Sequence, residues 1–344
     1  MSPHELTARL LEPGERLAWD RAAARCPWKS FFSTGLWLEA HPKAWGALKV
    51  VGLFQNNELI AGAAFAVRRR LWQRVWTTHP LTPYAAFWIA ESEGASPSRR
   101  ESLHDAVVGA LDRFLAAHAD EALLRLDPRV RDARPFVRRG WEASARGTYL
   151  TDLDPAAEPL DAFENDARRQ IAKARQAGIE VRQDPDWQGF SLRAQATLSR
   201  KGLSGRYPPG FLEQLGQALE AQGRGVLLSA FSSDGRPLAS AVVVWEGDWA
   251  TYLFGASMVE ARGTGASSLL QAETLAYLRR LGAVRVYDWH GANTPAISQF
   301  KKNFNPRVAD YLFLRKCYGL PTALAHALRG AVHRWKISRA RGEP

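Results

Sequence analysis

Three polar residues in the second half of the sequence have side chains that could move a proton or stabilise negative charge. Asp288 and His290 alternate at the end of an apolar run, so they face the same side if a strand continues that far. An amine loses a proton when it attacks a carbonyl, and a carboxylate or an imidazole tuned near the working pH accepts that proton. The imidazole has the better unperturbed pKa. Further along the chain, Lys301 can hold a phosphate or stabilise the oxyanion of a tetrahedral intermediate.

A glycine-rich turn precedes these residues and predicts a site for an anionic group. The turn, residues 262–267, follows a predicted strand at 251–254 and precedes an apolar-periodic helix predicted over 267–281. This order aims backbone amides at the N-terminus of the helix, where the helix dipole also favours negative charge. The alternative is that the glycines only supply the positive φ of a turn between strand and helix. The residues expected to hold the donor end of the substrate are Arg262, Gly263, Gly265 and Ser267.

The order of these parts resembles the C-terminal half of GNAT acyltransferases, and more narrowly the Fem-type peptidyltransferases and the related FemAB-like, BioF2-like acetyltransferase domains. The D-x-x-G strand end of that family corresponds to residues 288–291, and its F-K-x-x-F motif to residues 300–304. Its basic helix, R-x-x-I-x-K-A-x-x-x-G-I-x-V, is matched by residues 168–181. The resemblance covers residues from about 160 to 316 and extends to the first half only by architecture.

The resemblance implies that the donor is acyl-CoA or an aminoacyl-tRNA ester. GNAT enzymes bind the pyrophosphate of acyl-CoA through the pattern R/Q-x-x-G-x-G/A, which Arg262 and Gly265 match. Ser267 stands where this pattern has Gly or Ala. The glycine-rich turn favours CoA, whereas the Fem-like closing motif and the basic charge favour aminoacyl-tRNA.

The resemblance also implies roles for the residues around the second motif. Lys301 matches the lysine that lies at the substrate and donor site of Fem-type proteins, and Phe300 and Phe304 are expected to pack inward on one helix. Because the family does not require a histidine at position 290, Asp288 is preferred to His290 as a catalytic residue. Structural roles stay open for both, as a strand-end cap or ion pair for the carboxylate and as a hydrogen-bonded structural histidine.

Polar residues on a loop at 200–209, which faces the acceptor in this family, suit an anionic or sugar-bearing substrate. The residues expected to bind the acceptor are Arg200, Lys201, Tyr207 and Asn293. The basic helix at 168–175 either contacts phosphates of the acceptor or of tRNA, or is a solvated charged face.

The chain reads as two similar halves. Each half has a predicted hairpin, at 48–67 and at 226–245, followed by a helix, a strand and a closing strand. The pattern predicts a mixed α/β fold class, and the resemblance implies two tandem GNAT-like domains that each contain a mixed, mostly antiparallel sheet flanked by helices. The predicted domains span residues 1–155 and 156–318, followed by a basic tail helix at 319–344, and residues 163–220 are predicted to be helical throughout.

The composition restricts the partners and the compartment. The net charge of +11 favours anionic partners such as nucleic acid, acidic lipid surfaces or phosphorylated cofactors, although arginine-rich proteins without such partners also exist. No apolar run approaches the roughly 20 residues that span a bilayer, and the N-terminus lacks the apolar segment of a secretory signal. The 2 cysteines lie far apart and His and Cys do not cluster, so no metal site is expected. We expect a cytoplasmic protein, and a peripheral contact of the tail helix with the anionic inner face of the membrane stays open.

These observations together predict an N-acyltransferase. It would move an acyl group from acyl-CoA of the acetyl-CoA type, or from aminoacyl-tRNA, to an amine of a cell-envelope precursor such as one of peptidoglycan, or of a polar small molecule. The alternative is a non-catalytic GNAT-like module that binds RNA or anionic lipid through a basic cleft. The 13 tryptophans fit core packing best, with base stacking or a membrane interface as the alternatives.

Overall fold

The computed structural model of the chain describes residues 6–42, 46–70, 72–79, 81–154, 159–203, 207–291 and 295–319. These residues separate into two compact units. The first unit contains the described residues of 6–38, 46–145 and the segment from Tyr311 onward, and the second contains 39–42 and 146–310. The predicted boundary between residues 155 and 156 lies outside the described residues, as does the predicted tail helix beyond residue 319.

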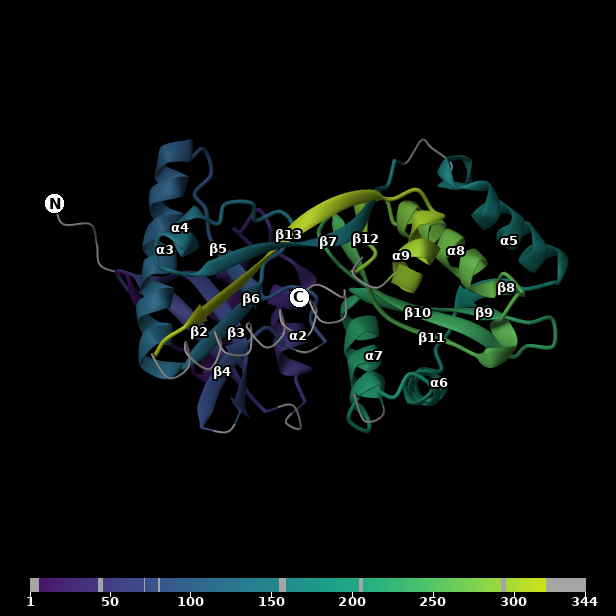
Figure 1. The fold of residues 1–344 in the computed structure, drawn as a ribbon, viewed down its shortest axis with the longest axis horizontal. Coiled ribbons are helices and arrows are strands. Elements are labelled where there is room, and N and C mark those ends of the chain that lie inside the picture. Colours follow the sequence, from purple (N-terminus) through teal and green to yellow (C-terminus); the bar gives the residue numbers. More distant parts are fainter. Residues whose placement is uncertain are drawn as a thin grey trace, which may run out of the picture. The chain divides into compact units, whose positions relative to one another are not determined.

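The first unit is built on a mixed, mostly antiparallel sheet (Figure 1). Its strands pair in the order β1 (Thr7–Leu10), β2 (Ala47–Gln55), β3 (Glu58–Arg70), β4 (Gln73–Thr77), β6 (Glu121–Arg125) and β13 (Arg307–Cys317), with β5 (Ala86–Ile89) paired to β3. The β4–β6 pair is parallel, and the other pairs within this unit are antiparallel. The predicted hairpin at 48–67 is therefore confirmed as β2–β3.

A long helix and a tryptophan-rich core complete the first unit. The helices are α1 (Arg16–Ala23), α2 (Gly35–Glu39), α3 (Pro97–His118) and α4 (Arg134–Val137), with 3-10 turns η1 (Pro13–Glu15) and η2 (Phe31–Ser33). Helix α3 begins at an N-cap in which the side chain of Ser96 accepts a hydrogen bond from the backbone of Arg99. In the core, Trp19 and Trp88 are fully buried and their rings meet edge to face at 5.0 Å. Core packing thus accounts for most tryptophans of this unit.

The second unit has a sheet of the same kind. Its strands pair in the order β7 (Glu142–Asp152), β12 (Val286–Asp288), β11 (Trp249–Ser257), β10 (Pro237–Glu246), β9 (Gly225–Phe231) and β8 (Glu180–Gln183). The β11–β12 pair is parallel, and the other pairs within this unit are antiparallel. The mixed sheets of the two units confirm the predicted fold class.

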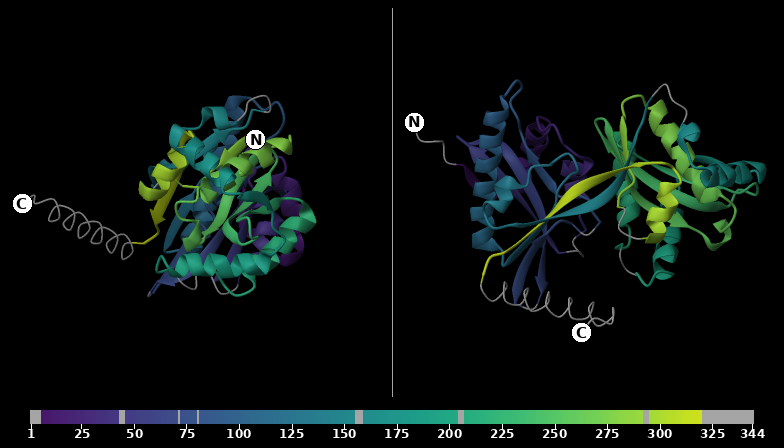
Figure 2. Two further views of the ribbon diagram at one scale, coloured as in Figure 1. Left: turned by 90° about the vertical axis from the view of Figure 1, so that its right-hand side faces the viewer. Right: turned by 45° about the horizontal axis from the view of Figure 1, so that its top comes forward.

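Helices cover both faces of this second sheet. They are α5 (Asn165–Gln176), α6 (Trp187–Ser199), α7 (Phe211–Gln222), α8 (Ala266–Arg280) and α9 (Pro295–Lys302), with 3-10 turns η4 (Pro159–Ala162) and η5 (Val259–Ala261). Helices α5 and α8 lie on one face and α6 and α7 on the other, which is visible from more than one side (Figures 1 and 2). The amphipathic character predicted for the basic helix is confirmed, because Ile171 and Ala174 of α5 are buried.

The prediction that residues 163–220 are helical throughout is wrong. Strand β8 interrupts the helices and pairs with β9, for example Val181 with Ala230. The strand is only four residues long, and one apolar side chain alternates with charged ones in it. A period of two over so few residues is too short to be distinguished from a loop in the sequence.

Candidate functional site

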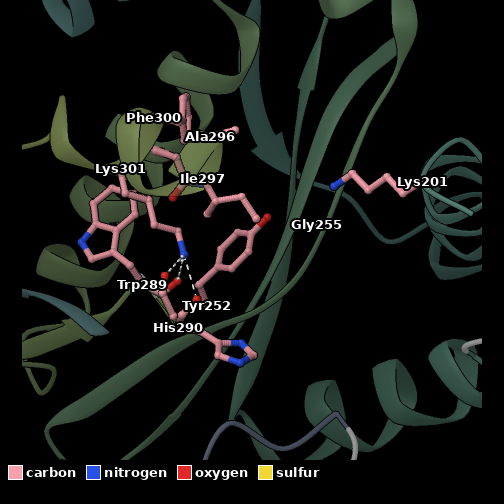
Figure 3. A pocket seen from close by; sticks show the side chains of 11 residues that line it. Lys201, Tyr252, Gly255, Trp289, His290, Ala296, Ile297, Phe300 and Lys301 are labelled. Carbon is pink, nitrogen blue, oxygen red and sulfur yellow. Dashed lines mark hydrogen bonds between the residues drawn. The ribbon is translucent and has the colours of Figure 1, made fainter. Parts of the chain in front are cut away.

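The candidate site lies in the second unit, where two parallel strands part. β11 and β12 are paired from Trp249 opposite Val286 to Thr251 opposite Asp288. β12 ends there, whereas β11 continues to Ser257. A cavity of about 500 Å³ lies beside this gap, in agreement with the general preference of ligands for the carboxyl ends of parallel strands (Figure 3). The residues that line the cavity are Lys201, Tyr252, Gly255, Gln271, Trp289, His290, Gly291, Ala296, Ile297, Phe300 and Lys301.

A β-bulge shapes the wall that β11 contributes. Opposite β10, Tyr252 pairs with Val243 and Phe254 with Val242, so Leu253 is an extra residue on β11. The extra residue resets the alternation of faces, which allows Tyr252 and Gly255 both to line the cavity. A Cβ at Gly255 would overlap the hydroxyl of Tyr252, so a glycine here makes room for the tyrosine ring along the strand. Burial raises the pKa of the Tyr252 hydroxyl, which therefore stays protonated at neutral pH.

Asp288 ends β12 and is buried, with 0% of its surface exposed. Its Oδ1 accepts a hydrogen bond from Thr148 Oγ1 at 2.7 Å and one from the backbone N of His290 at 2.9 Å. The Thr148 hydroxyl in turn accepts a hydrogen bond from the backbone N of Gly291 at 3.2 Å. The carboxylate and the hydroxyl therefore fix the turn that follows the strand, and Asp288 is not among the residues that line the cavity.

His290 lines the cavity from a left-handed backbone conformation with φ of 55°. The expectation that a continuing strand places Asp288 and His290 on one face is wrong, because β12 ends at Asp288 and the chain turns. A non-glycine residue with positive φ carries backbone strain, and the surrounding structure has to hold it in place. The hydrogen bonds from Asp288 and Thr148 are part of that support.

Lys301 supplies the rest of the support. Its ammonium is buried and donates to the backbone oxygens of Trp289 at 2.6 Å, His290 at 2.8 Å and Gly291 at 2.9 Å (Figure 3). An ammonium has three N–H donors, so these three carbonyls use all of them. Burial lowers the pKa of Lys301 to about 8, and the charge of Asp288 opposes part of that shift. In this geometry Lys301 positions the turn and has no donor left for a phosphate or an oxyanion.

The aromatic residues of the F-K-x-x-F motif pack against the same turn. The ring of Phe304 lies 5.0 Å from that of Trp289 and 5.3 Å from that of Phe300. α9 ends at Lys302, so the expectation that Phe300 and Phe304 lie on one helix is wrong, although Phe304 is buried as expected. The two motifs identified in the sequence thus pack against each other, and residues 300–304 fix the turn at residues 288–291.

The predicted donor turn lies outside this cavity. Gly263 and Gly265 have positive φ of 70° and 82°, which favours glycine at both positions. A Cβ at Gly265 would overlap the carbonyl oxygen of Gln170, because α5 packs against the first turn of α8, whereas a Cβ at Gly263 would meet open space. Arg262 is exposed and Ser267 is half-buried. An anion can therefore approach the turn from the side of Arg262 and Gly263, but not past α5.

The structure separates the predicted acceptor residues. Lys201 lines the cavity and extends towards it from the side opposite α9 (Figure 3). Arg200 instead donates to the backbone oxygen of Ser257 and ties the end of α6 to β11. The ring of Tyr207 packs 5.1 Å from that of Phe254, and Asn293 lies outside the described residues.

Sequence reasoning missed residues that the structure brings to the site. Thr148 comes from β7, far away in the sequence, and no local pattern marks it. Tyr252 and Gln271 look like ordinary strand and helix residues until the bulge and the cavity are seen. Only Gly255, which directly follows the predicted strand, could have indicated a bulge or a close approach on β11, because glycine in a strand often marks such a position.

The described residues contain no group of three or more His, Cys, Asp or Glu side chains arranged to hold a metal ion. In the same part of the chain, no helix combines the length and the apolar character needed to cross a bilayer.

Comparison with known proteins identifies the class of this domain. Residues 162–302, which include all the residues that line the cavity, match the sequence family described as Acetyltransferase (GNAT) domain. Among curated protein sequences, none matches the chain.

Solved structures confirm the fold over nearly the whole chain. A crystal structure of FemX has a TM-score of 0.66 at 14% identity, and covers 93% of this chain and 99% of its own. A tandem GNAT protein from the clavulanic acid biosynthesis pathway has a TM-score of 0.56 at 14% identity, covering 92% of this chain and 99% of its own. The C-terminal domain of a putative lysylphosphatidylglycerol synthetase from Agrobacterium fabrum has a TM-score of 0.57 at 15% identity, covering 91% of this chain and 95% of its own. The fold is thus shared with FemX and with a tandem GNAT protein, as the resemblance implied.

Proposed function

We propose that the second unit is an N-acyltransferase that acts on an amine bound in the cavity beside β11 and β12. The observation that carries the proposal is the turn at residues 289–291, which presents His290 to a cavity in the segment that matches the GNAT acetyltransferase domain. A strained residue that several buried groups hold in place, at the edge of a cavity, is typical of a functional position.

In the proposed reaction the amine nitrogen attacks the carbonyl carbon of the donor and a C–N bond forms. The bond from that carbon to the sulfur of a thioester, or to the oxygen of an aminoacyl ester, breaks. The imidazole of His290 accepts the proton of the amine, and the leaving thiolate or alkoxide takes up a proton. Asp288 and Lys301 act through the turn that carries His290, so the preference for Asp288 as the base passes to His290 in this proposal.

For the donor, the proposal favours acyl-CoA held at the turn before α8. The exposed guanidinium of Arg262 and the open side of Gly263 would receive the pyrophosphate. Aminoacyl-tRNA is the second candidate, because the Gln170 carbonyl closes one side of the turn and α5 presents basic side chains to solvent. For the acceptor, the Lys201 ammonium at the cavity suits an anionic substrate. The structural neighbour named as a lysylphosphatidylglycerol synthetase supports a cell-envelope substrate.

A ligand-stabilisation experiment tests the donor. Thermal unfolding of the full chain is followed with acetyl-CoA, with bulk tRNA and with inorganic phosphate, at low and moderate salt. Stabilisation by acetyl-CoA that persists at moderate salt, and that Arg262→Ala loses, supports the CoA assignment. Arg280→Ala is the matched control, because it removes the same charge from the exposed C-terminal end of α8, the helix that follows the turn. Steeply salt-dependent stabilisation by tRNA alone would favour the aminoacyl donor.

The chemical step needs a separate test. Release of free thiol from acetyl-CoA, or of deacylated tRNA, is measured with a pool of amines that includes amine-bearing envelope precursors. We expect the wild type to transfer and His290→Gln to transfer much more slowly while binding the donor as the wild type does. Donor binding without transfer to any amine in the pool would favour the non-catalytic module instead.

A further inference from the structure

The hairpin between β3 and β4 extends beyond the rest of the first unit's sheet. β2 pairs with β3 only as far as Val67, and β6 pairs with β4 only from Val75 onward. Between these positions, β3 and β4 pair with each other alone among the described strands. We call the described residues of 68–74, which leave out residue 71, the ribbon tip; β3 and β4 end there at the free end of their hairpin (Figure 1). Gln73 of this ribbon is buried, so the surface available to a partner is the one formed by the exposed side chains of residues 68–70 and 72.

The ribbon tip carries exposed cationic and aromatic side chains. Its sequence is RRRLWQR, and Arg68, Arg69 and Arg70 are all exposed. Within the described part of the chain, none of these three arginines makes an ion pair. Arg74 differs, because its backbone N and its Nε donate to Asp120, at 2.6 Å and 3.3 Å. Asp120 therefore holds β4 at Arg74, which lies opposite Arg69, while no acidic side chain of the described residues pairs with the three arginines of β3.

Trp72 is exposed over 60% of its surface. It is the only tryptophan among the large apolar residues that are exposed in the described part of the chain. The indole ring prefers the boundary between lipid and water, since its apolar body and polar N–H fit the two sides of that boundary. A guanidinium pairs well with phosphate oxygens. The ribbon tip thus combines an aromatic anchor with phosphate-binding groups.

We propose that the ribbon tip is a membrane-contact site for an anionic phospholipid surface. Trp72 inserts at the level of the headgroups, and Arg68, Arg69 and Arg70 pair with lipid phosphates around it. A single-stranded nucleic acid needs a basic groove that follows its backbone, and the tip lines none of three cavities in the described part of the chain, those around Lys301, Arg307 and Arg99. A narrow ribbon with an aromatic end suits insertion into a flat surface better.

Vesicle co-sedimentation of the full chain tests the proposal. The probes are vesicles of phosphatidylcholine alone and of phosphatidylcholine mixed with phosphatidylglycerol, and the same variants are titrated with bulk tRNA. The test variant carries Arg68→Ala, Arg69→Ala and Arg70→Ala together. The matched control carries Arg21→Ala, Arg99→Ala and Arg113→Ala, which remove the same charge from exposed positions of the same unit. Equal midpoints of thermal unfolding show that both variants are folded.

We expect the wild type to bind the mixed vesicles and not those of phosphatidylcholine alone. The test variant should bind about a hundredfold more weakly, because each basic residue near an anionic surface contributes about a factor of five. The control should stay close to the wild type, and Trp72→Ala should lose the part of the binding that resists high salt. Equal weakening in the control would assign binding to the overall net charge, and a test variant that loses tRNA affinity but keeps vesicle affinity would make the tip an RNA site. Either result overturns the proposal.

Discussion

The role of Lys301 leads to a prediction that separates a positioning residue from one that acts on substrate. Replacement by methionine keeps most of the unbranched stem and removes the ammonium that donates to the oxygens of Trp289, His290 and Gly291. Three buried carbonyls then lose their partner. Lys301→Met should therefore loosen the turn, which lowers the unfolding free energy and also displaces His290 from its position at the cavity.

The size of the effect follows from two opposing contributions. A hydrogen bond from a charged donor contributes at least about 1.5 kcal/mol to the unfolding free energy, so the three bonds of Lys301 contribute about 4.5 kcal/mol. Lys301→Met also removes the cost of burying a charge. The lowering of the Lys301 pKa from 10.5 to about 8 corresponds to about 3 kcal/mol, at ~1.36 kcal/mol per pH unit. The net loss of unfolding free energy at neutral pH is therefore about 1–2 kcal/mol.

Denaturant unfolding of Lys301→Met, compared with Lys302→Met, measures this loss. Lys302 is the adjacent, exposed lysine of the same helix, and its replacement should change the unfolding free energy by less than about 0.5 kcal/mol. A Lys301→Met variant that is as stable as Lys302→Met and yet abolishes acyl transfer would refute the positioning role of Lys301. That result would mean that the ammonium acts on the substrate and that the carbonyl contacts are incidental.

Three further predictions concern the same unit. The stability difference between the wild type and Lys301→Met should widen as the pH rises from about 8 towards 10.5. The pKa of Lys301 is lower in the folded than in the unfolded protein, so the cost of its buried charge lowers wild-type stability below pH 8 and disappears as the proton leaves between pH 8 and 10.5. A stability difference that narrows over this range in unfolding experiments would contradict the prediction. Thr148→Val should lower the unfolding free energy by about 1–3 kcal/mol by leaving Asp288 and the Gly291 amide with fewer partners, whereas Thr148→Ser should retain most of it. Gly265→Ala should lower the melting temperature more than Gly263→Ala. An alanine with positive φ costs about 1–2 kcal/mol at either position, but only a Cβ at position 265 also meets the Gln170 carbonyl. Equal losses would argue against close packing of α5 on this turn.

Much of the fold could be predicted because its signals are local. The hairpin β9–β10 follows from two apolar runs around Asp234-Gly235, and Gly235 has the positive φ that such a turn requires. Helix α8 follows from the spacing of its apolar residues, and its observed start at Ala266 is one position from the predicted one. The short edge strands β1 and β8 were not predicted, because four residues carry too little periodicity.

The candidate site could be located from the sequence but not its internal geometry. The motifs at residues 288–291 and 300–304 correctly indicated where the turn lies, since their residues are close in the chain. Their partners are not close. Thr148 reaches Asp288 only through the pairing of β7 with β12, and the direction of the Lys301 side chain depends on where α9 packs. Asp288 and His290 do not alternate along a strand, because the chain turns after Asp288. In this turn the backbone N of Gly291 donates a hydrogen bond to Thr148 on β7, which is distant in the sequence.

The central claim is that the cavity beside β11 and β12 receives the amine together with the acyl end of the donor, whose phosphates would lie at the turn before α8. A calorimetric titration with each donor tests this claim. Acetyl-CoA and aminoacyl-tRNA are titrated into the wild type, into Ala296→Trp, which fills the cavity from α9, and into Gln299→Trp, a control on the same helix outside the lining. The account predicts that one donor binds the wild type and Gln299→Trp alike and binds Ala296→Trp at least tenfold more weakly, a change of about 1.4 kcal/mol. Equal binding of that donor to all three proteins, or binding of neither donor to the wild type, would contradict it.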